Sequence, residues 1–204
     1  GSDASNTDSM KRVAHAKKLM GGRFYNQSVV RDAESIKDIT VFVQGMVSQL
    51  LPTSYQKKAK TIATAIIRES EKQGFDPIFV IAVIQNESRF NPEMRGMHGE
   101  IGLMQIKPST ADWLAGHKVF NKKNRLKFKN GADQALLNPV ENIRVGLAFM
   151  AQLRDSFDGE SRLYVSAYNM GAKKVRDLVR SGKQPRDYVQ AVMKRYIAMY
   201  SAFL

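Results

Sequence analysis

The sequence contains no cysteine and only three histidines, His15, His98 and His117. The missing thiols exclude disulfides, thiol catalysis and cysteine-ligated metals. None of the histidines lies in an HExxH pattern, so we expect no zinc site and no other metal or cofactor. Long apolar runs are missing too: the longest spans residues 78–84, which is far too short to cross a bilayer. A transmembrane segment is therefore not expected in this chain.

Acidic residues are also in short supply. The 204 residues include 32 Lys and Arg but 19 Asp and Glu, which gives a formal net charge of +13. A basic surface favours a polyanion such as nucleic acid, anionic lipid or a cell-wall polymer. No nucleic-acid-binding motif and no basic stripe interleaved with aromatic residues accompanies the charge, so nucleic acid is not the expected partner.

Strand-like alternation is nearly absent and helical periodicity dominates, which predicts an all-α fold. Residues 1 to about 10 are small and polar, and we expect them to be disordered. Helices are predicted over about 33–50, 54–73 (with Ser54 as its cap), 77–88, 139–157, 161–169, 173–181 and 186–202. A short irregular or β-like stretch is expected around 94–106. We therefore divide the chain into a partly disordered N-terminal extension with one helix, residues 1–53, and a main domain, residues 54–204.

The helix predicted to begin at Asp76-Pro77 carries the clearest candidate for chemistry. Its residues 78–84 are apolar on every face, so the helix should be buried. Glu87 lies near the C-terminal end of this helix, and the residues three, four and seven positions before it, which share its side of the helix, are all apolar. Burial and the negative end of the helix dipole both disfavour a charged carboxylate, so the pKa of Glu87 should be raised, as a general acid requires. The alternative is a helix-end glutamate that turns into water or pairs with Arg89.

Three further segments offer groups that can bind a sugar. Gly102-Leu103-Met104-Gln105 combines a flexible apolar side chain with an amide. Ala167-Tyr168-Asn169 adds an aromatic ring and a second amide, which suit the apolar faces and polar rims of sugars. The hydroxyl of Tyr188 could point toward the same site. Each segment taken alone is equally well explained as core: a buried loop, a helix that ends at Gly171, and a buried tyrosine.

The order and spacing of these segments, Glu87-Ser88, then 102–105, 167–169 and Tyr188, resemble the soluble-lytic-transglycosylase-like family, whose fold is related to goose-type lysozyme. The resemblance covers about residues 54–200 and implies a lysozyme-like catalytic domain preceded by a helical extension. It implies a peptidoglycan lytic transglycosylase that cleaves the MurNAc–GlcNAc β-1,4 bond without water and forms 1,6-anhydro-MurNAc. It also implies export to the periplasm or the bacterial cell envelope, with peptidoglycan glycan strands as substrate and other envelope proteins as candidate partners.

The resemblance further implies a role for each matching residue. These are Glu87 as general acid and base, Ser88 as its support, Met104 and Gln105 as residues lining the glycan groove, Tyr168 and Asn169 as the floor of the cleft, and Tyr188 as the hydroxyl that orients Glu87. The sequence departs from the usual family pattern at Glu93–Glu100 and at Lys173-Lys174. These departures bear on which substrates bind rather than on the core chemistry.

Most glycosidases use two carboxylates across the scissile bond. No second carboxylate is tied to the motifs, although Glu100 and Asp112 are candidates. A single carboxylate fits the internal attack that the resemblance implies. A hydrolytic goose-type muramidase, which would need a second carboxylate and a positioned water, is one alternative. A non-catalytic peptidoglycan-binding module is another.

Overall fold

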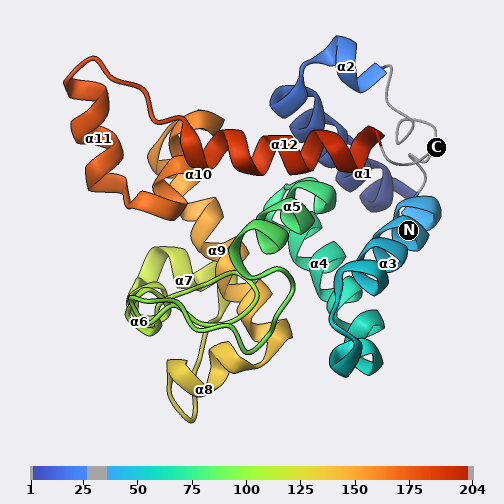
Figure 1. Cartoon of the computed structure of the whole chain (residues 1–204), viewed down its shortest axis with the longest axis horizontal. Coiled ribbons are helices and arrows are strands. Elements are labelled where there is room, and N and C mark those ends of the chain that lie inside the picture. The colour runs from blue at the N-terminus through green and yellow to red at the C-terminus, as the bar shows by residue number, and fades with distance from the viewer. Residues whose placement is uncertain (1, 27–35, 202–204) are drawn as a thin grey trace.

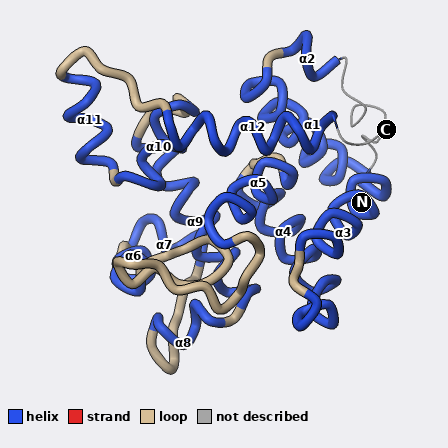
Figure 2. Tube along the Cα trace, viewed as in Figure 1, coloured by secondary structure: helices blue, strands red, loops and turns tan. Residues whose placement is uncertain are grey.

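The computed structural model of the chain describes residues 2–26 and 36–201. Their regular secondary structure is helical throughout, as Figures 1 and 2 show. Two isolated β-bridges, Arg95↔Ile101 and Ile101↔Ile106, fall in the stretch expected to be irregular or β-like. The prediction of an all-α fold is therefore confirmed for the described part of the chain.

The first half of the chain contains α1 (Ser2–Met20), α2 (Gly22–Asn26), α3 (Ile36–Leu50), the 3₁₀ helix η2 (Thr53–Lys58), α4 (Ala59–Gln73) and α5 (Pro77–Ser88). The second half contains α6 (Pro108–Gly116), α7 (Lys118–Asn124), α8 (Ala132–Leu137), α9 (Pro139–Ser156), α10 (Ser161–Met170), α11 (Ala172–Arg180) and α12 (Asp187–Ser201). The helices predicted after Pro77 agree with these bounds within one or two residues.

Three expectations about the first part of the chain differ from the structure. Residues 2–10, which we expected to be disordered, are helical and continue α1, and the described residues of the extension form α1, α2 and α3 where one helix was expected. The buried side chains of α1 lie farther along, from Arg12 to Ala16, and a helix that is anchored there extends at little further cost. Ser54 does not cap α4, because η2 intervenes and α4 begins after Lys58. The expected start of α3 at about residue 33 lies outside the described residues.

Helix α5 lies at the centre of the fold, and local sequence signals determine both of its ends. The Asp76 carboxylate accepts a hydrogen bond from the backbone N–H of Ile78 (3.0 Å), and Pro77 occupies the first turn, as predicted. The helix ends at Arg89, which adopts a left-handed conformation (φ 50°). Every residue from 77 to 84 is buried, as expected for a helix that is apolar all round.

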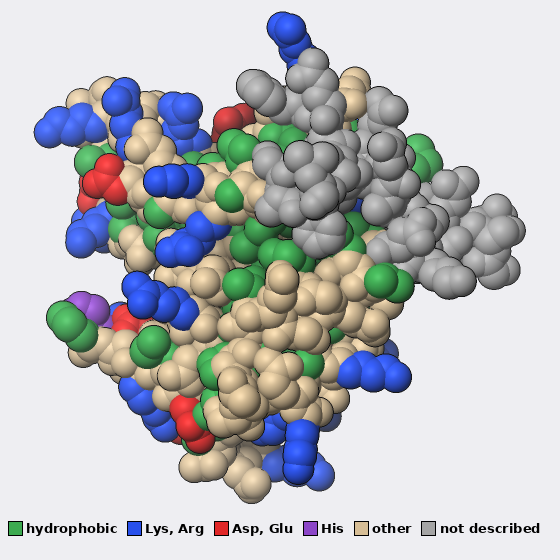
Figure 3. All heavy atoms as spheres, turned by 45° about the vertical axis from the view of Figure 1, so that its right-hand side comes forward, with side chains coloured by type: hydrophobic (Ala, Val, Ile, Leu, Met, Phe, Trp, Pro, Cys, Tyr) green, Lys and Arg blue, Asp and Glu red, His purple; other side chains and the backbone are tan. Residues whose placement is uncertain are grey.

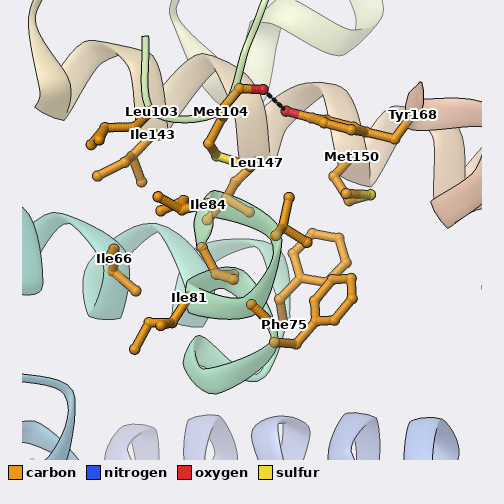
Figure 4. Close-up of a cluster of buried hydrophobic side chains, with 14 of the residues drawn as sticks. Ile66, Phe75, Ile81, Ile84, Leu103, Met104, Ile143, Leu147, Met150 and Tyr168 are labelled. Carbon is orange, nitrogen blue, oxygen red and sulfur yellow. Dashed lines mark hydrogen bonds between the residues drawn. The ribbon is translucent and has the colours of Figure 1, made fainter. Parts of the chain in front are cut away.

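The core packs α5 against α3, α4 and α12, while α4 in turn packs against α9, and α9 against α10. Figure 4 shows part of this core, in which side chains from α4, α5, α9 and the loop before α6 interdigitate. Its labelled members are Ile66, Phe75, Ile81, Ile84, Leu103, Met104, Ile143, Leu147, Met150 and Tyr168. Helices α6, α7 and α8, whose bounds the sequence did not predict, lie toward the lower left of Figure 1, and α6 and α8 pack against α9. No helix in the described ranges is long and apolar enough to span a membrane.

Helix α12 lies antiparallel along α5 and is hydrogen-bonded to it at both ends. At the start of α5, the hydroxyls of Tyr196 (2.7 Å) and Tyr200 donate to Asp76. At the other end of α5, the hydroxyl of Tyr188 donates to Glu87 Oε1. The position of Glu87 along the cleft is therefore determined jointly by the two helices.

The N-terminal helix α1 is joined to the start of α5 through a buried histidine. His15 Nδ1 accepts a hydrogen bond from the backbone N–H of Asp76 (2.9 Å), and its Nε2 lies 3.0 Å from the Tyr164 hydroxyl on α10. Since Nδ1 is an acceptor, the ring is the neutral tautomer that carries its proton on Nε2. Burial is the main cause that lowers the pKa of His15, to about 3. The extension thus shares buried polar contacts with the main domain.

Candidate active site

Glu87 lies on the last turn of α5, where the buried helix reaches a surface cleft. Burial raises the pKa of its carboxyl group to about 7, against the opposing effect of the hydrogen bond from Tyr188. The negative charge of nearby Glu100 raises this pKa further. The direction agrees with the sequence prediction, with burial as the main cause. A carboxyl group that is protonated near neutral pH can donate a proton.

The Tyr188 hydroxyl is directed at Glu87 because Tyr188 occupies the first turn of α12. Burial raises the pKa of this phenol far above its usual value, and the adjacent Glu87 raises it further. Tyr188 therefore stays protonated and acts as a hydrogen-bond donor to Glu87. Arg195, farther along α12, donates to Asn86 Oδ1 (3.3 Å) and adds a contact beside the site.

Ser88 is buried behind Glu87 and connects α5 to the loop that carries the next motif. Its hydroxyl lies 2.8 Å from the carbonyl oxygen of Leu103 and 3.2 Å from that of Ile84. The single hydroxyl hydrogen can therefore serve the end of the helix or the loop. Ser88 does not line the cleft, so the structure gives it a role in holding the loop beside Glu87.

Gln105 lines the cleft, and its side chain also braces its own loop. The amide nitrogen donates to the carbonyl oxygens of Gly102 (2.8 Å) and Met94 (3.1 Å). Gln105 itself adopts a left-handed backbone conformation (φ 51°). The side-chain oxygen lies beside Gly96, where an added Cβ would come within 2.9 Å of it.

The structure corrects the expectation for Met104. Its side chain has no exposed surface and belongs to the core shown in Figure 4, so it does not line the groove. Gly146 on α9 leaves the space for it, since a Cβ at Gly146 would lie 2.4 Å from Met104 Sδ. The backbone of Met104 still serves the site, because its carbonyl accepts a 2.6 Å hydrogen bond from the Tyr168 hydroxyl.

The cleft has a volume of about 620 Å³, which is enough for a few sugar rings. Tyr168 and Asn169, near the end of α10, line it together with Glu87 and Gln105. The cleft is also lined by His98, Ile106, Lys107, Thr110, Phe149 and Met170. Phe149 lies beside the Tyr168 ring at a centroid distance of 5.6 Å, and the pair offers an apolar wall for a sugar face.

Glu100 is a second carboxylate in the same cleft, which the motifs did not reveal. Its Oε2 accepts a hydrogen bond from the backbone N–H of His98 (2.9 Å), and Lys107 Nζ lies 3.7 Å from its Oε1. Partial burial opposes ionisation of Glu100, but backbone N–H groups and Lys107 outweigh it and lower the pKa of Glu100. Asp112, the other candidate from the sequence, is exposed on α6 and does not line the cleft.

Asn142 is a supporting residue that sequence reasoning missed. Its side chain is fully buried on α9, where Oδ1 accepts from the backbone N–H of Met104 (2.8 Å). Its amide nitrogen donates to the carbonyls of Ile101 (2.8 Å) and Leu136 (2.9 Å). An asparagine at a core-facing position of an otherwise apolar helix stripe was the available signal, because a buried amide needs partners.

Basic side chains dominate the surface around these elements. In the view of Figure 3, Lys and Arg are more numerous than Asp and Glu, in keeping with the net charge of +13. Lys174 on α11 and Lys107 carry this charge into the cleft itself. The neighbouring Lys173 points elsewhere and pairs with Asp177 (2.8 Å).

The fold and the cleft define a lysozyme-like helical domain. Residues 64–190, more than half of the chain, match the protein family described as Transglycosylase SLT domain. The chain therefore belongs to the SLT transglycosylase family, as the sequence resemblance indicated.

Curated relatives agree with this assignment. Membrane-bound lytic murein transglycosylase C from Edwardsiella ictaluri is 32% identical over 165 residues, which cover 72% of this chain and 44% of that protein. The protein of the same name from Serratia proteamaculans is 31% identical over 170 residues, covering 75% of this chain and 46% of that protein. The chain thus spans less than half of the length of these relatives.

A solved structure supports the same fold. Lytic transglycosylase Slt from Pseudomonas aeruginosa, solved as an inactive mutant, matches with a TM-score of 0.57 at 24% sequence identity. The match covers 84% of this chain and 28% of that one. The lysozyme-like fold expected from the sequence is therefore confirmed.

Proposed function

We propose that this chain is a peptidoglycan lytic transglycosylase that cleaves the MurNAc–GlcNAc β-1,4 bond, with Glu87 as its general acid and base. One observation carries the proposal: a carboxyl group whose pKa is raised to about 7 lies in a sugar-sized cleft and accepts a hydrogen bond from Tyr188. Membership of the SLT family and the names of its relatives support the same reaction and a place in the bacterial cell envelope.

The reaction uses one carboxyl group twice. Protonated Glu87 donates its proton to the glycosidic oxygen as the bond from that oxygen to C1 of MurNAc breaks. The 6-hydroxyl of the same MurNAc then attacks C1, and its proton passes to Glu87. The new bond closes a 1,6-anhydro ring, no water is consumed, and Glu87 returns to its protonated state. General acid–base assistance of this kind accelerates a reaction by roughly 10²–10⁴-fold.

Tyr188, Tyr168, Asn169 and Gln105 support this chemistry from the walls of the cleft. The Tyr188 hydroxyl orients the acid, while the amides of Asn169 and Gln105 suit the hydroxyl and acetamido groups of a glycan. Ser88 and the backbone of Met104 act indirectly: Ser88 holds the loop beside Glu87, and the Met104 carbonyl holds Tyr168 there.

A hydrolytic muramidase is a second candidate, and the position of Glu100 favours it. In an inverting hydrolase, a second carboxylate activates a water on the opposite face of the sugar. Glu100 lines the same cleft as Glu87 and carries a lowered pKa, so it is ionised when Glu87 is protonated. The product distinguishes the two reactions, since hydrolysis leaves a reducing MurNAc that is heavier by one water.

Mass spectrometry of the fragments released from purified peptidoglycan tests the proposal. We expect 1,6-anhydro-muropeptides from the wild type and none from Glu87→Gln, with both proteins showing the same circular dichroism and melting temperature. Hydrated products would transfer the assignment to the muramidase. Release of fragments by Glu87→Gln at a substantial fraction of the wild-type rate would refute the role of Glu87. Wall binding by both proteins without release would indicate a binding module.

A further inference from the structure

The loop between α5 and α6 places the carboxylate of Glu100 in the wall of the cleft, although Glu100 is not part of the Gly102–Gln105 motif. This loop folds back on itself through the bridges Arg95↔Ile101 and Ile101↔Ile106. The backbone N–H of Gly96 donates to the Glu100 carbonyl (2.9 Å), which closes a tight turn at the tip. Glu100 thereby follows the turn on the strand-like segment that leads directly to the Gly102–Gln105 motif.

The turn is built around the Glu100 side chain. A Cβ at Gly96 would lie 2.2 Å from Glu100 Oε2 and 2.9 Å from Gln105 Oε1, so a larger residue there would displace the ends of these two side chains. The backbone N–H of His98 donates to Oε2, and Lys107 lies near Oε1. The side chain of Glu100 keeps 21% of its surface exposed, and that surface faces the cleft that Glu87 also lines.

The two carboxyl groups are close enough to influence each other, and their pKa values are shifted in opposite directions. The charge of Glu100 contributes to the raised pKa of Glu87, whereas hydrogen bonds and Lys107 lower the pKa of Glu100. Environments that separate two carboxyl groups in this way divide the roles between a proton donor and a negative charge.

We infer that Glu100 is a second catalytic carboxylate, whose negative charge stabilises the positive charge that develops on the MurNAc ring as its bond to the leaving oxygen breaks. The inference rests on the proposed glycan cleavage and deepens it. Glu100 takes up no proton and forms no bond in this role: Glu87 still transfers the proton in both directions, and the 6-hydroxyl still attacks C1. A fixed negative charge beside a developing cation stabilises the transition state more than the neutral ground state.

The pH dependence follows from the groups that surround the pair. Those near Glu87 are Tyr188 from α12, Tyr168 from α10 and Glu100 from the loop; those near Glu100 are His98 and Lys107. Removing the charge of Glu100 removes a repulsion that favours protonated Glu87, so the pKa of Glu87 falls. The general acid is then lost at a lower pH, and the alkaline limb of the rate profile moves to lower pH.

The test compares kcat/KM and its pH profile for wild type, Glu100→Gln, Glu100→Asp and Asp112→Asn on soluble peptidoglycan fragments. Gln keeps an acceptor for the His98 N–H but no charge, Asp keeps the charge on a shorter side chain, and Asp112→Asn removes an exposed charge outside the cleft. We expect Glu100→Gln to lose about 100-fold in kcat with little change in KM. We expect Glu100→Asp to recover part of that loss and Asp112→Asn to match the wild type.

Each other outcome overturns the inference. A rate and an alkaline limb that are unchanged in Glu100→Gln would mean that Glu100 only closes the turn. Equal losses in Glu100→Gln and Glu100→Asp, or a loss accompanied by a lower melting temperature, would mean that the side chain supports the loop and not the reaction. A wild-type protein without turnover is a different result: it refutes the proposed function, and the role of Glu100 falls with it.

Discussion

The buried side chain of Asn142 accepts a hydrogen bond from the backbone N–H of Met104 at 2.8 Å, and so attaches the cleft loop to helix α9. The same side chain donates to the carbonyls of Ile101 and Leu136, so all three of its hydrogen-bond partners are backbone groups. One residue of α9 therefore holds both the loop that carries Glu100 and Gln105 and the end of α8.

Asn142→Ala should destabilise the protein strongly. The change leaves the Met104 N–H and the Leu136 carbonyl without this partner, while the Ile101 carbonyl keeps its bond from the Ile106 N–H. An unsatisfied buried group costs about 1–3 kcal/mol. We expect the free energy of unfolding in urea to fall by roughly 3 kcal/mol, allowing for partial relaxation. Asn169→Ala, an exposed change in the same cleft, serves as the control and should stay within about 0.5 kcal/mol of wild type. A comparably small effect of Asn142→Ala would contradict this account of the loop.

Local signals were sufficient to predict the part of the fold that carries the acid. Asp76-Pro77 predicted the start of α5, and the apolar residues that follow predicted its burial. These two facts were enough to predict that the pKa of Glu87 is raised. Asn138-Pro139 likewise located the start of α9, where the Asn138 side chain accepts from the N–H of Val140 (2.9 Å). Such signals work because a cap or a buried stripe acts within one or two turns of a helix.

The features that sequence reasoning missed depend on residues far apart in the chain. Met104 is buried because Gly146 leaves room for it, and Asn142 is essential because the loop lies beside it. Glu100 was one of two carboxylate candidates in the sequence, but its entry into the cleft depends on a turn whose geometry no helical period encodes. Helix α1 is ordered by contacts such as that between His15 and Asp76, which its polar composition did not suggest. Tertiary contacts of this kind override local propensity.

Tyr188→Phe should change the pH profile in the direction opposite to Glu100→Gln. The hydroxyl stabilises the ionised form of Glu87 and lowers its pKa, so its removal raises the pKa above about 7. The general acid then stays protonated to higher pH, and the alkaline limb of kcat/KM moves upward. The lost orientation of Glu87 should also reduce kcat by about tenfold, the equivalent of one hydrogen bond to a charged group.

The matched control for this experiment is Tyr55→Phe. Tyr55 also donates its hydroxyl to a glutamate, Glu93, but the pair is exposed and lies outside the cleft. Its removal should leave the rate and the pH profile unchanged. An alkaline limb that moves downward in Tyr188→Phe, or does not move, would show that the hydroxyl does not act on Glu87 in the way we describe.

Two adjacent lysines allow the charge of the cleft to be tested. Lys174 lines the cleft, whereas Lys173 is held by Asp177 outside it. Stem peptides of peptidoglycan carry carboxylates, so Lys174→Gln should raise KM for peptide-bearing strands by about threefold, as expected for an exposed charge, with kcat unchanged. Lys173→Gln should match the wild type. The difference between the two variants should shrink as salt rises from 0.05 to about 0.5 M; equal KM values for both variants at low salt would rule out the contact.

The neutral His15 should make the folded state sensitive to acid. Its pKa is about 3 in the folded protein and ordinarily 6.5, so between pH 7 and pH 5 the unfolded chain takes up a proton at His15 and the folded protein does not. Stability is therefore lost as the pH falls through this interval, by about 2 kcal/mol through His15 alone.

Urea unfolding at pH 7 and pH 5 isolates this effect when wild type is compared with His15→Gln and with His98→Gln, whose histidine is exposed. His15→Gln is less stable at pH 7, because a glutamine cannot reproduce both the contact to the Asp76 N–H and the contact to Tyr164. Its further loss on acidification should nevertheless be about 2 kcal/mol smaller than that of wild type, since no group remains at this position to be protonated in the unfolded chain. His98→Gln removes an exposed imidazole and so controls for the loss of a histidine as such. Identical losses in all three proteins would mean that His15 is protonated in the folded state, and that α1 is held to α5 by something other than a neutral imidazole.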